Sequence, residues 1–240
     1  MDEECGNMRI LRAASLGLSL ASALASGTAL AEPLRGVTYV GGTLSESISG
    51  YVGAVVSLPG AQLGDGASIK AGVSGGRYEY DASGTRITAK YVGVDMAVGY
   101  QFSGNWGWAN VSVGPTFART SLSPEDPNNE RNGSRWDLAV QSDGAYDGSN
   151  WRLGWYGGYG AFNKAYQARL QLGRKTGSGN LRLGIEAGVQ GDSRYTKGFA
   201  GAFVSKPIGK NLDLLVSAGA SEQAGRGARA YGSIGLSKLF

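Results

Sequence analysis

Three isolated carboxylates are the residues of this chain best suited to act as acids or bases. Asp95, Asp137 and Glu186 each stand alone in an alternating segment, and no two of them form a recognisable pair. The chain has no histidine, and its single cysteine is Cys5. Catalysis that depends on histidine, including Ser–His–Asp triads, is therefore excluded. Because no nucleophile stands beside a base, we expect a protein that is not an enzyme.

The same counts bear on cofactors and charged partners. A single cysteine cannot form a disulfide within the chain. The chain also has no histidine and no thiolate cluster that could hold a metal. We therefore expect no metal and no cofactor. The formal net charge is +4, and lysine and arginine occur singly along the chain. This distribution does not favour a nucleic-acid partner.

Polar side chains alternate with apolar ones over most of the chain after residue 35. In 181–190, leucine, isoleucine, alanine and valine occupy one face, and arginine, glutamate, glutamine and glycine occupy the other. A period of two is typical of strands with one apolar and one polar face. We expect the following polar residues on the inward face of a barrel: Lys70, Asp95, Gln101, Asn110, Arg135, Asp137, Gln141, Arg152, Arg169, Gln171, Lys175, Arg182, Glu186 and Asp213.

The elements that would position these residues are about twelve strands. Turn signals divide the chain into 36–44, 47–58, 67–80, 86–102, 106–120, 134–146, 149–162, 166–176, 180–190, 195–206, 211–221 and 228–240. Ten or more residues suit a tilted membrane crossing better than a soluble sandwich. Glycine, at 41 of 240 residues, fits a sheet in which backbones crowd or bend. We expect an all-β, antiparallel, up-and-down outer-membrane β-barrel.

The connections support this interpretation. In outer-membrane barrels, long loops are extracellular and alternate with short periplasmic turns. The longest connection, 121–134, falls at an odd position and is predicted to be a surface loop that includes Pro124, Glu125, Asp126, Pro127 and Asn128. Aromatic residues near the predicted strand ends indicate interfacial girdles. They are Tyr78, Tyr80, Tyr100, Phe102, Trp106, Tyr146, Trp151, Phe162 and Tyr166.

The first residues resemble an export signal. Arg9 and Arg12 precede an uncharged stretch over 13–31 that ends in small residues, as signal peptidase requires. The acidic residues at 2–4 do not fit such a signal, which favours Met8 as the true start. We expect a cleaved signal peptide at 1–31, a single barrel domain over 32–240 and a location in the cell outer membrane. Five Ser/Thr residues in the stretch argue against a transmembrane anchor.

The inward charges allow two interpretations of the lumen. Mixed charges can pair with each other and fill a narrow barrel, since unpaired buried charge is costly. Alternatively, they line a polar pore. The mixture of signs and the modest strand number favour a filled lumen.

Short motifs through most of 36–240 resemble the cellulose biosynthesis protein BcsS family. They include the stretch 50–60, the arginine and tyrosines at 77–80, the glycine-led segment 99–102, the loop 123–128 and the strand 169–173. Their order and spacing carry the resemblance. The chain has Pro59 and Gly60 where an asparagine–glycine turn is typical, and its first strand is less typical than the rest.

This resemblance implies an accessory role in the biosynthesis or export of bacterial cellulose, an exopolysaccharide. Membrane lipid, the cellulose chain and components of the cellulose synthase complex are the partners it implies. A neutral polymer would be held by aromatic faces and hydroxyl-bonding groups, and the candidates for sugar stacking are Trp108, Trp136, Trp151 and Trp155. Trp151 and Trp155 fit a membrane girdle equally well. The alternatives are a passive porin for small oligosaccharides and a structural barrel whose surface loop docks another envelope protein.

Overall fold

A closed β-barrel makes up the part of the chain that the structure describes. This computed structural model describes residues 34–82, 84–177, 180–193, 195–224 and 227–240. The predicted signal peptide at 1–31 and the choice of start at Met8 lie outside these residues. Within the described residues, no helix is long and apolar enough to cross a membrane.

Twelve strands form the barrel, as the alternating pattern predicts. Their bounds are β1 Gly36–Leu44, β2 Ile48–Ser57, β3 Gly66–Ala82, β4 Thr85–Gly104, β5 Gly107–Ser123, β6 Gly133–Asp147, β7 Trp151–Gly160, β8 Tyr166–Thr176, β9 Leu181–Gly191, β10 Thr196–Gly209, β11 Leu212–Gln223 and β12 Arg229–Leu239. The predicted loop 121–134 is too long at both ends, because β5 continues to Ser123 and β6 begins at Gly133. The connection itself is 124–132.

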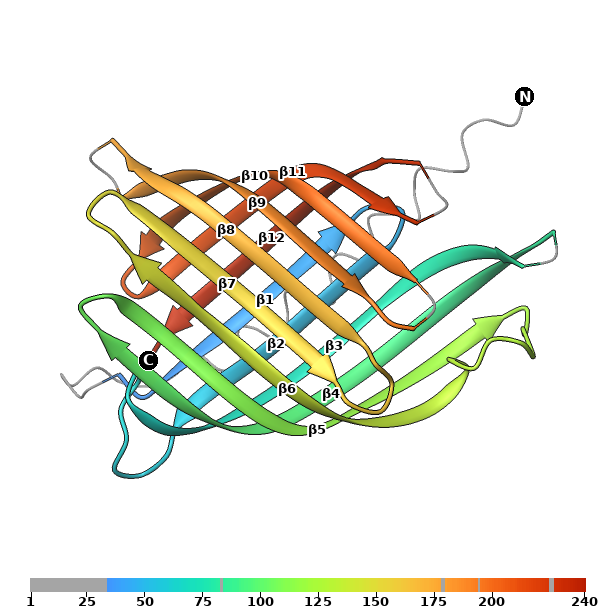
Figure 1. The fold of residues 1–240 in the computed structure, drawn as a ribbon, viewed down its shortest axis with the longest axis horizontal. Helices are drawn as coiled ribbons and strands as arrows, with labels where there is room; N and C mark the ends of the chain where they lie inside the picture. Colours follow the sequence, from blue (N-terminus) through green and yellow to red (C-terminus); the bar gives the residue numbers. More distant parts are fainter. Residues whose placement is uncertain (1–33, 83, 178–179, 194, 225–226) are drawn as a thin grey trace. The chain divides into compact units, whose positions relative to one another are not determined.

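Every strand pairs with its neighbours in the chain, and the first and last strands close the ring (Figure 1). All pairings are antiparallel, and the β1–β12 seam places Tyr39 opposite Ser237. Closure leaves no unpaired strand edge. The backbone N–H and C=O groups of such an edge would be costly in lipid, where no water can hydrogen-bond to them. The predicted antiparallel, up-and-down β-barrel is confirmed.

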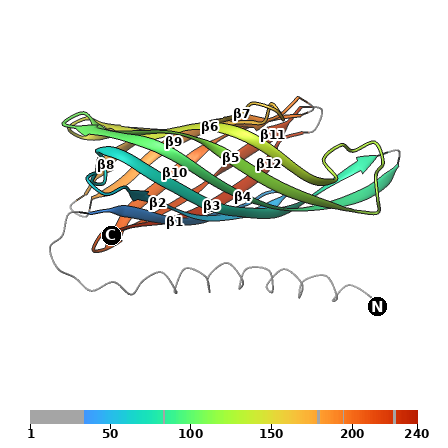
Figure 2. The same cartoon turned by 90° about the horizontal axis from the view of Figure 1, so that it is seen from below.

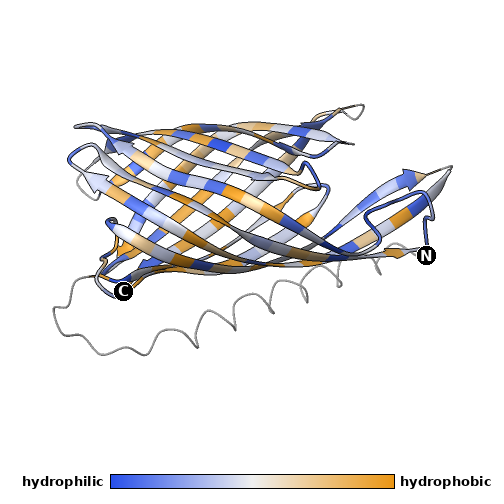
Figure 3. Ribbon diagram, turned by 60° about the horizontal axis from the view of Figure 1, so that its bottom comes forward, coloured by the Kyte–Doolittle hydropathy of each residue, from blue (hydrophilic) through white to orange (hydrophobic). Residues whose placement is uncertain are grey.

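The two faces of the sheet separate by polarity along each strand (Figure 3). On β4, Val94, Met96 and Val98 are exposed on the outer face, whereas Asp95, between them in sequence, faces inward. Apolar residues on the outside of a barrel and polar residues on the inside reverse the arrangement of a soluble protein and suit a surrounding of lipid.

The barrel has two unlike ends. We call the end where β1 begins and β12 finishes the terminal end, and the opposite end the loop end. Strands β3 to β6 have 15 to 20 residues, and the hairpins they form extend past the other strands at the loop end (Figures 1 and 2). In outer-membrane barrels the short turns are periplasmic and the longer loops extracellular. The loop end therefore corresponds to the outer side.

Gly107 shows why glycine is needed at one tight turn of the terminal end. It begins β5 with φ +127°, and a Cβ at this position would lie 2.0 Å from the carbonyl oxygen of Ala145. Only glycine combines that backbone conformation with such a close approach. The turn between β4 and β5 can therefore be very short.

Candidate functional site: the barrel lumen

Strand register places the predicted polar residues on the lumen face. Inward positions pair with inward positions around the whole ring, so that Asp95 lies opposite Gly72 and Gln171 opposite Glu186. The same register brings the following residues to the inner face: Asp95, Gln101, Asn110, Arg135, Asp137, Arg152, Arg169, Gln171, Arg182 and Glu186. Their contribution to a function stays a prediction.

Lys70 on β3 has inward register and is buried inside the barrel. Its Nζ donates a hydrogen bond to Gln141 Oε1 at 2.5 Å. The same Nζ lies 5.9 Å from the ring centre of Tyr39 and 5.7 Å from that of Tyr156, within the range of cation–π attraction. Tyr39 is on β1 and Tyr156 on β7, which are six strands apart in a ring of twelve. Side chains from opposite walls therefore meet at one ammonium group inside the lumen. We call Lys70, Gln141, Tyr39 and Tyr156 the lysine cluster.

A second cluster surrounds Glu186, which is buried. Its Oε2 accepts hydrogen bonds from Arg169 Nη2 at 2.5 Å and Gln171 Nε2 at 2.8 Å, and its Oε1 accepts one from Tyr231 Oη at 2.6 Å. Arg169 also donates to Ser217 Oγ. A buried carboxylate that is both paired and fully hydrogen-bonded is stable as an anion. We call these residues the glutamate cluster.

The other two predicted carboxylates have different surroundings. Asp137 accepts hydrogen bonds from the backbone amides of Leu138, Phe162 and Asn163, and so holds the turn between β7 and β8. Asp95 Oδ2 is buried and has no hydrogen-bond partner among the described residues. Of the three carboxylates, only Asp95 therefore has an oxygen that is not engaged in holding the fold.

The loop end is crossed by Arg131, from the connection between β5 and β6. Its guanidinium forms an ion pair with Asp192, lies 4.7 Å from the ring centre of Tyr195 and hydrogen-bonds Tyr78 on β3. Burial lowers the pKa of Arg131, but the contacts with Tyr78 and Asp192 outweigh it and raise the pKa overall. The guanidinium is therefore charged throughout the physiological pH range. Because β3 and the β9–β10 connection lie on opposite walls, this contact spans the mouth.

The loop that carries Arg131 is anchored to the long hairpin beside it. Tyr80 Oη donates to Asp126 Oδ2 at 2.9 Å and accepts from Asn129 Nδ2 at 2.6 Å. The ring of Tyr80 packs on the buried apolar residues Ile87 and Leu122. The loop therefore has a defined position over the mouth, although sequence reasoning treated it as an exposed surface segment.

A third contact joins the rim at the loop end. Lys197 on β10 lies 3.6 Å from a carboxylate oxygen of Glu46 and donates to Ser45 Oγ at 3.1 Å. Both acceptors belong to the β1–β2 connection. Side-chain contacts thus join opposite walls of the lumen at the lysine cluster, and loop contacts join the rim again at the mouth.

The four tryptophans predicted to stack on sugar do not share one face. Trp136 is 67% exposed on the outer face and contacts Phe117. Trp151 stacks on Tyr146, and Trp155 hydrogen-bonds Ser142, also on the outside. Trp108 alone has the inward register, opposite Ser103 and Ala145. Three of the four therefore lie where lipid would contact them, and their proposed contact with sugar stays untested.

The predicted girdle needs one correction. Tyr100, Phe102, Tyr146, Trp151 and Phe162 are exposed, and the first four lie on the outer face of their strands. Tyr78 and Tyr80 instead have the inward register and lie under the loop. Their hairpin extends beyond the other strands, so a position near a predicted strand end did not indicate the membrane interface there.

Sequence reasoning missed the tyrosines that line the lumen. Tyr39, Tyr51, Tyr156 and Tyr231 all have inward register. A signal was present, because each alternates with residues that face lipid. The predicted inward set contains only charged and amide side chains, so these tyrosines are not part of it.

The described residues contain no group of three or more histidine, cysteine, aspartate or glutamate side chains arranged to hold a metal ion. The clusters found in the lumen are ion pairs and hydrogen bonds between side chains of the barrel.

The sequence matches one known family over the whole barrel. Residues 37–240 match the family described as cellulose biosynthesis protein BcsS. The chain belongs to the BcsS family. A role in cellulose biosynthesis follows from this membership. No curated protein matches the sequence.

Solved structures that resemble this BcsS-family barrel are outer-membrane proteins. The TodX monoaromatic hydrocarbon channel is 9% identical with a TM-score of 0.52, covering 87% of this chain and 91% of the channel. The transport unit of the autotransporter AIDA-I from Escherichia coli is 10% identical with a TM-score of 0.51, covering 95% and 97%. An outer membrane channel from Pseudomonas putida F1 is 13% identical with a TM-score of 0.50, covering 90% and 99%. At these identities the likeness shows the fold alone.

Proposed function

We propose that this protein is a non-catalytic accessory barrel of the outer membrane that supports cellulose biosynthesis or export while its lumen is closed at rest. It engages the cellulose chain or components of the synthase complex at its ends. Family membership supports the process, and the outer apolar face supports the membrane location. The observation that carries the proposal is the lysine cluster, in which side chains of opposite walls meet.

The engagement of the carboxylates supports a non-catalytic role. Glu186 and Asp137 are fully occupied in holding side chains and a turn. Removing either would disturb the fold, so loss of activity in such variants would not identify a catalyst. Asp95 is the informative position, because its Oδ2 has no hydrogen-bond partner in the part of the chain that the structure describes.

The test combines gene deletion with complementation in the native host. Deletion is expected to lower cellulose output, and the wild-type gene to restore it, with the protein recovered in the outer-membrane fraction. Asp95→Asn is expected to restore output to within about twofold, because a catalytic acid or base contributes about a hundredfold or more. Unchanged cellulose after deletion would overturn the assignment to the process. Loss of complementation by a correctly folded Asp95→Asn barrel would overturn the non-catalytic role.

Conductance separates an accessory barrel from a passive porin. The wild-type protein in planar lipid bilayers is expected to be closed for most of the recording. A stable open conductance in every inserted barrel would make the porin the better description.

A further inference from the structure

The lumen contains a cavity on the terminal side of the two clusters. Its volume is about 290 Å³, and its lining comes from the beginning of β1, β7 and β11 and the end of β8, β10 and β12, together with β2 and β9. Asp213 is exposed at the edge of this cavity, so the cavity opens toward the terminal end. Tyr39 and Gln171 line it and also belong to the lysine and glutamate clusters. The clusters therefore form its inner boundary.

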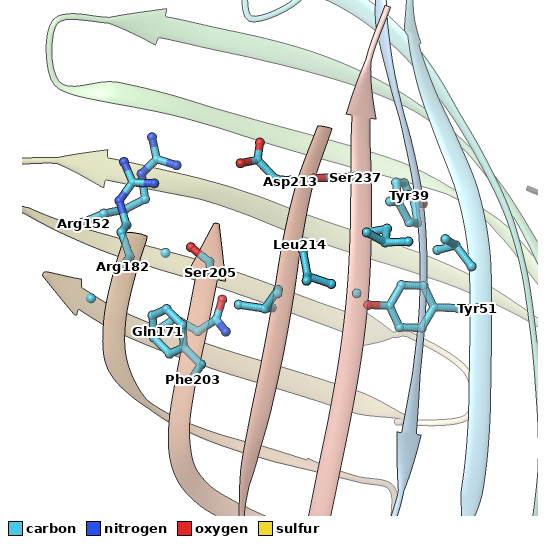
Figure 4. Close-up of a pocket in the computed structure, with 16 residues that line it drawn as sticks. Tyr39, Tyr51, Arg152, Gln171, Arg182, Phe203, Ser205, Asp213, Leu214 and Ser237 are labelled. Carbon is cyan, nitrogen blue, oxygen red and sulfur yellow. The ribbon is translucent and has the colours of Figure 1, made fainter. Parts of the chain in front are cut away.

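One wall of the cavity is aromatic. The rings of Tyr39 and Tyr51 lie side by side, with centres 6.2 Å apart and planes at 51° (Figure 4). Each ring lies over a glycine of the neighbouring strand, and a Cβ at Gly53 or Gly41 would come within 2.5 Å of the corresponding phenol oxygen. The glycines let the rings lie along the wall. Tyr51 consequently keeps 44% of its surface exposed inside the lumen.

The opposite side of the cavity supplies hydrogen-bonding groups. Figure 4 shows the guanidinium groups of Arg152 and Arg182 across from the two tyrosines, with Ser205 and Asp213 between them. Arg152 is already paired with Asp147, at 2.5 and 2.6 Å. Arg182 Nε is buried without a hydrogen-bond partner among the described residues. A buried donor left in this state costs free energy that a bound acceptor would recover.

The balance of charge identifies the class of ligand. Arginine donors and the Asp213 acceptor line the same space, and Asp147 compensates Arg152. Such a site can bind donors and acceptors together but has little excess charge to attract an anion. An aromatic face opposite mixed polar groups suits a ligand with apolar C–H faces and a rim of hydroxyl groups. A neutral saccharide has both.

We propose that this terminal-end cavity binds the end of a neutral β-linked glucan, with a C–H face of a sugar ring on Tyr51 and hydroxyl groups on Arg182 and Asp213. The volume lies just below the range of about 300–1,000 Å³ for small-molecule sites, so it suits about one or two sugar rings. The inference rests on the proposed function and names the ligand that binds at the terminal end of the barrel. Because the lysine cluster closes the space beyond it, the glucan is held there and does not pass through.

The test measures binding of cellotetraose to the full chain extracted in detergent, by titration calorimetry. Wild-type protein is expected to bind it, and Tyr51→Leu to bind about tenfold more weakly, the effect of losing one ring contact. The matched control is Tyr100→Leu, which removes a tyrosine of similar exposure, 49%, from the outer face. Its affinity is expected to stay within about twofold of wild type. A mobility shift without boiling verifies the fold of each variant.

Asp213→Asn provides a second variant near the cavity edge, and its affinity is also expected to fall about tenfold, since a hydrogen bond to a charged group is lost. No binding of cellotetraose by the folded wild type would overturn the inference. Equal affinities of Tyr51→Leu and Tyr100→Leu would also overturn it. Stronger binding of tetragalacturonic acid would overturn the neutral ligand in favour of an acidic one. None of these results would alter the deletion phenotype, so the proposed function is tested separately.

Discussion

Glu186 connects more of the lumen than its single position in an alternating strand suggests. Its carboxylate, on β9, accepts hydrogen bonds from side chains of β8 and β12, and Arg169 extends the contacts to Ser217 on β11. Four strands, β8, β9, β11 and β12, are therefore connected on the inside through one buried anion and its arginine partner. Removing the carboxylate would leave the Arg169 guanidinium partly buried without its counter-ion.

At the scale of the residue, Glu186→Ala is expected to lower the free energy of unfolding by about 3–5 kcal/mol, the usual cost of breaking a buried ion pair on one side. Asp81→Ala is the control, because Asp81 and Arg86 are 3.6 Å apart and mostly exposed. That change is expected to cost less than about 1 kcal/mol. Denaturant unfolding in detergent micelles measures both. Equal losses in the two variants would contradict a structural role for the glutamate cluster.

At the scale of the element, close strand contacts determine where glycine is required. On β5, a Cβ at Gly114 would lie 2.0 Å from the carbonyl oxygen of Met96 and 2.5 Å from the Cα of Ala97. Neither atom can move without displacing β4. At Gly157, on the outer face of β7, a Cβ would meet nothing within 4 Å. A side chain is thus excluded at Gly114 and has space at Gly157, although the two glycines cannot be told apart in the sequence.

Gly114→Val is accordingly expected to destabilise the barrel by about 1–3 kcal/mol through overpacking. Gly157→Val is expected to be neutral or slightly stabilising, because valine favours strands and its side chain would face lipid. The temperature at which the unboiled form loses its shifted mobility reports the difference. If Gly157→Val lost its shifted mobility at as low a temperature as Gly114→Val, the close contact with β4 would not explain the need for glycine at position 114.

At the scale of the whole molecule, side chains of opposite walls meet at two separate levels, and we propose that each level closes the lumen. The lysine cluster joins the walls in the middle, and Arg131 joins them at the loop end. Opening one level leaves the other closed. Conductance should therefore depend on both levels together.

Lys70→Ala and Arg131→Ala are each expected to leave the barrel mostly closed, and the double variant to show a stable open conductance in planar bilayers. Lys90→Ala combined with Arg119→Ala is the control, because it removes the same two positive charges at outward positions. Lys90 directly precedes the inward Tyr91, and Arg119 lies opposite the outward Val92. This control should not open the lumen. An increase of conductance with Arg131→Ala alone, equal to that of the double variant, would show that the mouth is the only barrier.

The sequence alone determined the strands and their faces. A period of two assigns each residue to the lumen or to lipid once the sheet is closed, and turn residues separate the strands, so the barrel and the inward set that includes Asp95, Arg169 and Glu186 could be read from local pattern. The loop was predicted too long by a few residues at each end, because serine-rich strand ends resemble turns.

Only the tertiary structure decided which inward residues meet. The contact of Lys70 with Tyr39 and Tyr156 depends on the strand number and register that place β1 opposite β7, and no local pattern carries this information. The same holds for Arg131 and Asp192, which are distant in the chain. Alternation assigns a face to a residue, but closing the ring determines its partners across the lumen.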